Sequence, residues 1–290
     1  MPRRSATRTP QRKPRNPRKA RKRRAWRLSA LWPSARTRRA WWRTFRRAPT
    51  FVQVLAALTA TIALGLAVNW VYQVARKPSE LFFPVSGTLY KTPAQTWATY
   101  APLFRRHATD VITPEFLAAL AQVEGSGNPI VRTYWRFALT SEPFEVYRPA
   151  SSAVGMYQIT DGTFAEARRY CIHRNRVVEE GRWYDLGSCW FNSLYTRVVP
   201  SHAVELTSAY LDRRVAAILA RHSLEAATSP QKRDLAAVIH LCGAGAASSY
   251  ARRGLRLLPA QHCGAHDLRA YLATVEAMQE RFARLAYSDD

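Results

Sequence analysis

The hydrophobic pattern of the chain separates one unbroken apolar run from a series of amphipathic segments. Residues 51–74 read FVQVLAALTATIALGLAVNWVYQV and contain no charged side chain. At about 1.5 Å per residue, a helix of this length spans roughly 36 Å, which is enough to cross a hydrocarbon core of about 30 Å. The run therefore predicts a transmembrane helix, and the alternative is a buried core helix.

The pattern after the apolar run predicts an exported domain that is mainly α-helical. Residues 75–104 contain several prolines and no clear period, which predicts a linker, and the domain then occupies residues 105–287. Thr113 is the expected N-cap of its first helix and Pro114 the first helical residue. Strand signals are few. Helical periodicity is found in residues 113–125, 163–171, 203–221, 231–241 and 266–286.

The basic residues are concentrated before the apolar run. Residues 1–50 carry 19 Lys and Arg and no Asp or Glu, whereas residues 78–290 carry 23 basic and 20 acidic residues. The positive-inside rule then places the N-terminus in the cytoplasm. A cleavable signal peptide fits less well, because ARKPSELFF follows the run instead of a small-residue cleavage site.

The composition of residues 1–50 predicts a disordered cytoplasmic tail that lies near anionic lipid, because it is basic, rich in proline and free of acidic residues. Nucleic acid is the less favoured partner, since charge alone gives only non-specific affinity. The tryptophans of the tail suit a membrane interface better than a base-stacking surface.

All four cysteines follow the apolar run, and an even number in an exported domain predicts two disulfides. Three pairings are open, and we favour the nearest-neighbour one, Cys171–Cys189 and Cys242–Cys263. The alternative is a metal site, but its spacing matches no common zinc pattern, so we expect no metal and no cofactor. The residues of that alternative are His240, Cys242, His262, Cys263 and His266.

Glu124 ends the first helical segment of the domain and is followed by Gly125 and Gly127. Cleavage of a glycosidic bond needs an acid that protonates the leaving oxygen. A carboxyl group that is partly removed from water keeps its proton more readily, and glycines give a substrate room to approach. Glu124 is therefore a candidate acid, although its position alone also fits an ordinary glutamate at a helix end.

The segments around Glu124 carry a family resemblance. Glu124-Gly125-Ser126 and then SSAVGMYQIT at residues 151–160 resemble the lytic transglycosylases that contain an SLT domain, which have a lysozyme-like helical fold. The resemblance covers residues 105–285 and is specific at 117–164. It implies that Glu124 is the acid and base. It also implies that Met156 and Gln158 touch the sugar, and that Ser151 or Ser152 supports the carboxylate.

The chain departs from the family pattern in two places. LAAVIHLCGAGAASSY has His240 and Leu241 where the family has tyrosine and asparagine, so His240 either donates a hydrogen bond or is a core residue. The stretch between Glu124 and Gln158 is also longer than is usual. Its aromatic rings either form a wall of a glycan cleft or pack in the core. They are Tyr134, Trp135, Phe137, Phe144 and Tyr147.

The apolar run and the resemblance together imply a single-pass inner-membrane protein with a periplasmic catalytic domain. Its substrate would be the peptidoglycan glycan strand, cut at the β-1,4 bond between MurNAc and GlcNAc to leave a 1,6-anhydro end. One alternative is a hydrolytic muramidase with Glu145 or Asp161 as a second acid. Another is a degenerate glycan-binding envelope protein. General wall remodelling and service to a secretion or pilus machinery both stay open.

Overall fold

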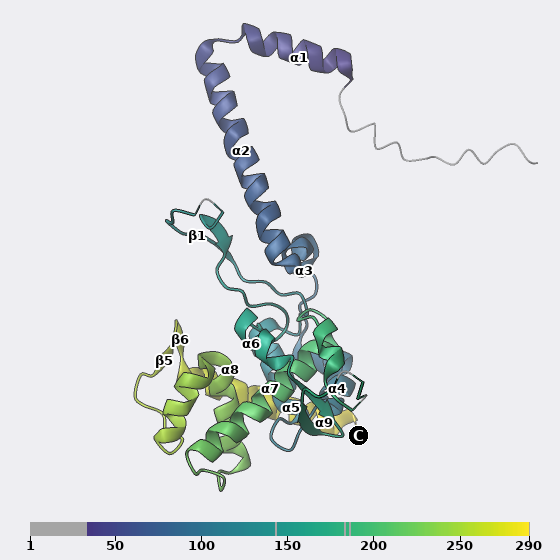
Figure 1. Cartoon of the computed structure of the whole chain (residues 1–290), viewed down its shortest axis with the longest axis vertical. Helices are drawn as coiled ribbons and strands as arrows, with labels where there is room; N and C mark the ends of the chain where they lie inside the picture. The colour runs from purple at the N-terminus through teal and green to yellow at the C-terminus, as the bar shows by residue number, and fades with distance from the viewer. Residues whose placement is uncertain (1–33, 143, 183, 186, 290) are drawn as a thin grey trace, which may run out of the picture. The chain divides into compact units, whose positions relative to one another are not determined.

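The computed structural model describes residues 34–142, 144–182, 184–185 and 187–289, and Figure 1 shows its helices and strands. The prediction of a mainly helical protein is confirmed, because the structure is 61% helical and 8% strand. The chain divides into two compact units, residues 1–64 and residues 65–290. The part of the predicted tail at residues 1–33 lies outside the described residues.

The prediction that all of residues 1–50 are disordered is wrong for residues 35–47, which form the helix α1 (Ala35–Arg47). Its N-cap is Ser34, whose hydroxyl accepts a hydrogen bond from the backbone N–H of Thr37. Alanine and arginine both have high helix propensity, so a basic composition is compatible with a helix once its first turn is capped. The rings of Trp41 and Trp42 are exposed.

The predicted apolar helix is present as α2 (Thr50–Arg76). Among the described residues, α2 is the one helix that is long and apolar enough to cross a membrane, and its most apolar stretch is entirely unburied. The exposure of that stretch contradicts the alternative of a buried core helix. Asn69 and Gln73, near its C-terminal end, are its buried residues.

The prediction of a linker at residues 75–104 is wrong. Trp97 and Phe104 lie in the hydrophobic core, and the helix that carries them packs against α5 and α9. The prolines misled the prediction, because Pro93 occupies the first turn of a helix, where its missing N–H removes no hydrogen bond. The elements of this segment are η2 (Pro78–Phe82), α3 (Phe83–Ser86) and α4 (Pro93–Arg106).

The core of residues 65–290 is built around α5, in which residues 116–121 are all buried. As predicted, Thr113 caps this helix and Pro114 is its first residue. α5 packs against α4 and α9, and α7 packs against α8. The helices after α4 are α5 (Pro114–Gly125), α6 (Asp161–Ala167), α7 (Pro200–Arg221), α8 (Ser229–Arg252) and α9 (Leu268–Asp289).

Short antiparallel hairpins stand between the helices in the described part of the chain. One of them corrects the helix predicted for residues 163–171, because α6 ends at Ala167 and Cys171 lies in a strand. The hairpins are β1 (Trp135–Phe137) with β2 (Tyr147–Pro149), β3 (Tyr170–His173) with β4 (Arg176–Glu179), and β5 (His262–Cys263) with β6 (His266–Asp267). The 3-10 helix η3 (Trp190–Leu194) precedes α7.

The favoured cysteine pairing is confirmed. Cys171 is bonded to Cys189 and Cys242 to Cys263. The first disulfide links β3 to the residue before η3, and the second links α8 to β5. Because all four sulfurs are in disulfides, they are not the thiolate ligands that the metal alternative required.

Candidate active site

Glu124 lies in the last turn of α5, and its side chain is 17% exposed. The helix ends in a left-handed residue, Ser126, at φ 47°, and Gly127 follows at φ 63°. Gly125 is the last residue of the helix. The carboxyl group of Glu124 therefore belongs to a helix that is buried at residues 116–121 and only partly exposed in its last turn.

Gly125 brings the two segments of the predicted motif into contact. A Cβ atom at residue 125 would lie 2.8 Å from the Cα and the carbonyl oxygen of Met156, closer than such atoms approach in proteins. Only glycine therefore lets the backbone at Met156 lie against the end of α5. This close approach fixes the segment 151–160 next to Glu124.

Tyr271 holds the carboxyl group of Glu124. Its hydroxyl donates a hydrogen bond to Glu124 Oε1 over 2.6 Å, although the two residues are 147 positions apart in the chain. Burial, together with the nearby charge of Glu124, raises the pKa of the Tyr271 phenol, so it remains a protonated donor at neutral pH. Among the described residues none is hydrogen-bonded to Glu124 Oε2, whereas Oε1 accepts the bond from Tyr271.

Tyr271 lies on the apolar stripe of the helix predicted at residues 266–286, and its contact with Glu124 was not predicted. Leu268, Leu272 and Val275 share that stripe and are core residues, so periodicity gave the tyrosine no separate role. The one available signal was chemical, since a buried tyrosine hydroxyl normally needs a hydrogen-bond partner.

His240 is the second neighbour of Glu124. Its Nε2 atom lies 3.7 Å from Glu124 Oε1, and its side chain is 11% exposed. This distance is too long for a hydrogen bond, so His240 is a close neighbour of the carboxyl group and not its hydrogen-bond partner. The regular path of α8 is interrupted three residues later at Gly243, where φ is 79°.

A small pocket adjoins this pair. It has a volume of ≈ 40 Å³ and is lined by His240, Gln158 and residues of α6 and α7. Gln158 adopts φ 46°, and its side-chain amide donates a hydrogen bond to the backbone oxygen of Gly155 over 2.8 Å. His240 therefore contacts both Glu124 and the pocket of Gln158, and three of the predicted site residues lie together.

Three other predicted site residues do not reach Glu124. The side chain of Met156 is 0% exposed and belongs to the core, so the prediction that it touches a sugar is wrong. The hydroxyls of Ser151 and Ser152 accept hydrogen bonds from the backbone N–H groups of Ala153 and Asp161. They stabilise local turns and do not support the carboxylate, which Tyr271 holds instead.

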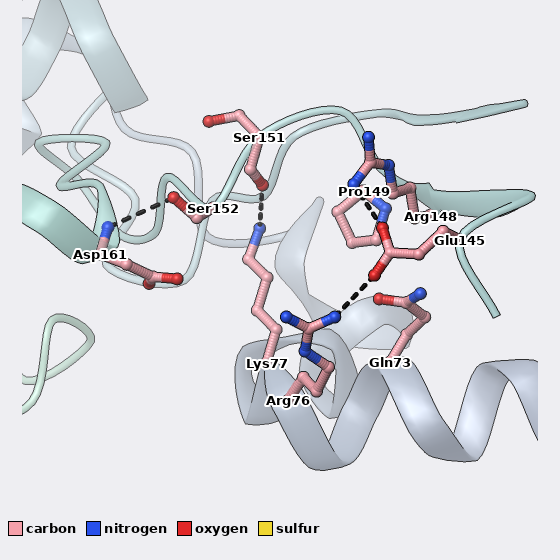
Figure 2. A pocket seen from close by; sticks show the side chains of 9 residues that line it. All are labelled: Gln73, Arg76, Lys77, Glu145, Arg148, Pro149, Ser151, Ser152 and Asp161. Carbon is pink, nitrogen blue, oxygen red and sulfur yellow. Dashed lines mark hydrogen bonds and ion pairs between the residues drawn. The ribbon is translucent and has the colours of Figure 1, made fainter. Parts of the chain in front are cut away.

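Ser151 and Ser152 line a different pocket of ≈ 140 Å³, shown in Figure 2. Glu145 in this pocket is ion-paired with Arg76 and Arg148. Asp161 is ion-paired with Arg197 over 2.8 Å. Both candidate second acids are thus neutralised by arginine in a pocket that Glu124 does not line.

The aromatic rings proposed as a cleft wall form a hairpin beside α2. Trp135 and Phe137 pack on Tyr147 across β1 and β2, and Phe144 stacks on Tyr72 of α2. Phe137 is 75% exposed. Phe144 is thus the ring that stacks on the apolar helix, Trp135, Phe137 and Tyr147 pack on one another, and a role of these rings as a cleft wall stays a prediction.

The chain matches no protein-family model, and no curated protein matches it. Within the described ranges, no group of three or more His, Cys, Asp and Glu side chains is placed to hold a metal ion. An activity for this chain must therefore be argued from the geometry around Glu124 and from the motifs that place it.

Proposed function

We propose that the protein is a membrane-anchored lytic transglycosylase with a lysozyme-like domain, which cuts the β-1,4 bond between MurNAc and GlcNAc in peptidoglycan. The observation that carries the proposal is the partly exposed carboxyl group of Glu124, fixed on one oxygen by Tyr271. The contact of Gly125 with Met156 supports it, because it joins the two segments that resemble the family.

Glu124 has two tasks in this reaction. As an acid, its Oε2 proton is transferred to the glycosidic oxygen while the bond from that oxygen to the anomeric carbon of MurNAc breaks. As a carboxylate, it then removes the proton of the sugar's 6-hydroxyl, whose oxygen bonds to the anomeric carbon. The products are a GlcNAc end and a 1,6-anhydro-MurNAc end, and no water is consumed.

The ion pairs of the two candidate second acids favour this outcome over hydrolysis. A hydrolytic muramidase normally needs a second carboxylate to activate water or to form a covalent intermediate. Glu145 and Asp161 are both ion-paired with arginine and line another pocket. The 6-hydroxyl of the substrate supplies the nucleophile that these residues are not placed to activate, and no cofactor is needed.

The anchor in this proposal is α2, crossing the inner membrane with the N-terminus in the cytoplasm. Its exposed apolar surface and the arginines of α1 before it support that orientation. Two disulfides in residues 65–290 suit an oxidising periplasm. The catalytic domain would then meet peptidoglycan strands directly, alone or in an envelope or secretion machinery.

The products of digestion test this function. Purified peptidoglycan sacculi are incubated with the full chain in detergent, and the released muropeptides are analysed by mass spectrometry. We expect 1,6-anhydro ends. Reducing MurNAc ends would instead establish a hydrolase, and binding to sacculi without any cleavage would establish a degenerate glycan-binding protein.

Replacing Tyr271 by Phe should lower kcat/KM about 10- to 100-fold, because a hydrogen bond to a charged group contributes about 1.5–3 kcal/mol. The ring is retained, so the melting temperature should change little. The matched control is Tyr287→Phe on the same helix, where the ring is 88% exposed. Equal activity of the two variants would show that Tyr271 contributes only the packing of its ring against the helices next to α9.

A further inference from the structure

The C-terminal end of α2 carries two amide side chains that are hidden from solvent. Asn69 and Gln73 are 6% and 5% exposed, although the surrounding residues of this helix are largely exposed. In a hydrocarbon environment a side-chain amide without a hydrogen-bond partner is strongly unfavourable. The hydrogen-bond partners of Asn69 and Gln73 therefore indicate where α2 leaves the hydrocarbon.

Both amides are hydrogen-bonded to the second half of the β1–β2 hairpin. Asn69 Nδ2 donates to the backbone oxygen of Tyr147 over 2.7 Å, and Gln73 Nε2 donates to that of Phe144 over 2.6 Å. The ring of Tyr72 stacks on Phe144 with 4.9 Å between centroids. Residues 144–147 therefore run directly against the last turns of α2.

Charged groups fix the base of the hairpin to the same end of α2. Arg76 is ion-paired with Glu145 over 2.6 Å, and Lys77 Nζ donates to the backbone oxygen of Ser151 over 3.2 Å (Figure 2). Trp135, on the first strand, donates its indole N–H to Glu80 over 2.9 Å. The hairpin is thus held from both strands.

The length of α2 gives the level of these contacts relative to a bilayer. Residues 51–68 make about 27 Å of helix, close to a hydrocarbon thickness of about 30 Å. Asn69 and Gln73 then lie at the outer edge of the hydrocarbon, where Trp70 and Tyr72 also fit an interfacial aromatic belt. The hairpin, which Figure 1 shows beside this end of α2, lies at the same level.

The hairpin exposes a group of large apolar side chains at that level. Single exposed apolar residues are common on soluble proteins, but five of them within one short hairpin favour a contact surface. Tyr134 and Phe137 are each 75% exposed, Leu139 is 108% exposed, and Phe144 and Val146 are 40% and 37% exposed.

We infer that the β1–β2 hairpin, residues 134–147, is a second membrane contact and inserts these apolar side chains into the outer interface of the bilayer that α2 crosses. The inference rests on the proposed membrane anchoring and is independent of the proposed catalysis. A lipid surface is the occupant because the hairpin is bonded to the membrane-surface end of α2 and lies at the headgroup level. The exposed Arg136 and Glu142 keep it at the interface.

Depth-dependent quenching of a fluorescent label tests this contact in the full chain. The native cysteines are all in disulfides, so Leu139→Cys gives a single thiol for labelling. Leu58→Cys, in the middle of α2, serves as the reference inside the bilayer, and Tyr287→Cys near the end of α9 as the reference in water. Each variant is placed in phosphatidylcholine–phosphatidylglycerol vesicles that contain lipids with a nitroxide near the headgroup or near the chain end.

We expect the label at residue 139 to be quenched more strongly by the headgroup nitroxide than by the chain-end nitroxide. The label at residue 58 should be quenched more strongly by the chain-end nitroxide, and the label at residue 287 by neither. If the label at residue 139 is not quenched while the label at residue 58 is, the hairpin contact alone is overturned. Protection from both the lipid nitroxides and aqueous iodide would also overturn it, in favour of contact with a second copy. Absence of quenching at 58 would overturn the anchor itself.

Discussion

Replacing Glu124 by Gln lowers the release of anhydro-muropeptides by at least about 10²–10⁴-fold, the usual contribution of acid–base catalysis. The amide has the same shape, and its oxygen still accepts the hydrogen bond of Tyr271. It has no transferable proton for the glycosidic oxygen and does not act as a base toward the 6-hydroxyl. Binding to sacculi and the melting temperature should therefore stay nearly unchanged.

The matched control is Glu115→Gln, which removes a carboxylate from the first turn of the same helix. That variant should keep full activity. Mass spectrometry of the products distinguishes the two variants at equal protein concentration. Normal yields of anhydro ends from Glu124→Gln would remove Glu124 from the reaction and, with it, the proposed mechanism.

Loss of either disulfide lowers the free energy of unfolding by about 2–5 kcal/mol, the usual effect in an exported domain. The Cys242–Cys263 and Cys171–Cys189 bonds join residues 21 and 18 positions apart, so their effects should be similar in size. Urea unfolding of the double variants Cys242→Ser/Cys263→Ser and Cys171→Ser/Cys189→Ser measures each contribution separately.

The two double variants differ in their distance from the site and serve as controls for each other. Cys242 follows His240 by two residues, so its loss should also reduce cleavage, whereas the Cys171–Cys189 variant should lose stability alone. Protein purified from the envelope should contain no free thiols. Detection of four free thiols there, or unfolding curves that reductant leaves unchanged, would refute this prediction.

The parts of the fold that the sequence predicted correctly are those determined by local chemistry. The N-cap at Thr113 and the apolar run of α2 depend on neighbouring residues only, and both are present. α4 was missed because prolines near and within it obscured a helix whose stability comes from Trp97 and Phe104 in the core. The helix predicted for residues 163–171 extended into the first two residues of β3, because four residues are too few to establish a period of two.

The site residues also fall into those that the sequence predicted and those that it missed. Glu124, Gln158 and His240 could be predicted as a group because the family resemblance of their segments implied it. Tyr271 could not be predicted, because its contact with Glu124 joins two helices and the two residues are 147 positions apart in the chain. The role given to Ser151 and Ser152 failed because their hydroxyls bond to backbone groups within the segment, which a residue type alone does not reveal.

The hydrogen bonds of Gln73 and Lys77 to Phe144 and Ser151 fix the end of α2 directly against the folded domain, where a flexible linker would otherwise connect them. An enzyme on a flexible stalk searches a volume whose radius grows with stalk length. With α2 in the membrane, this domain searches only laterally, at one height. Under the proposed function, it would meet the glycan strands nearest the bilayer and leave the outer layers of the wall intact. Its reach would then be set by its first hairpin and not by its affinity for substrate.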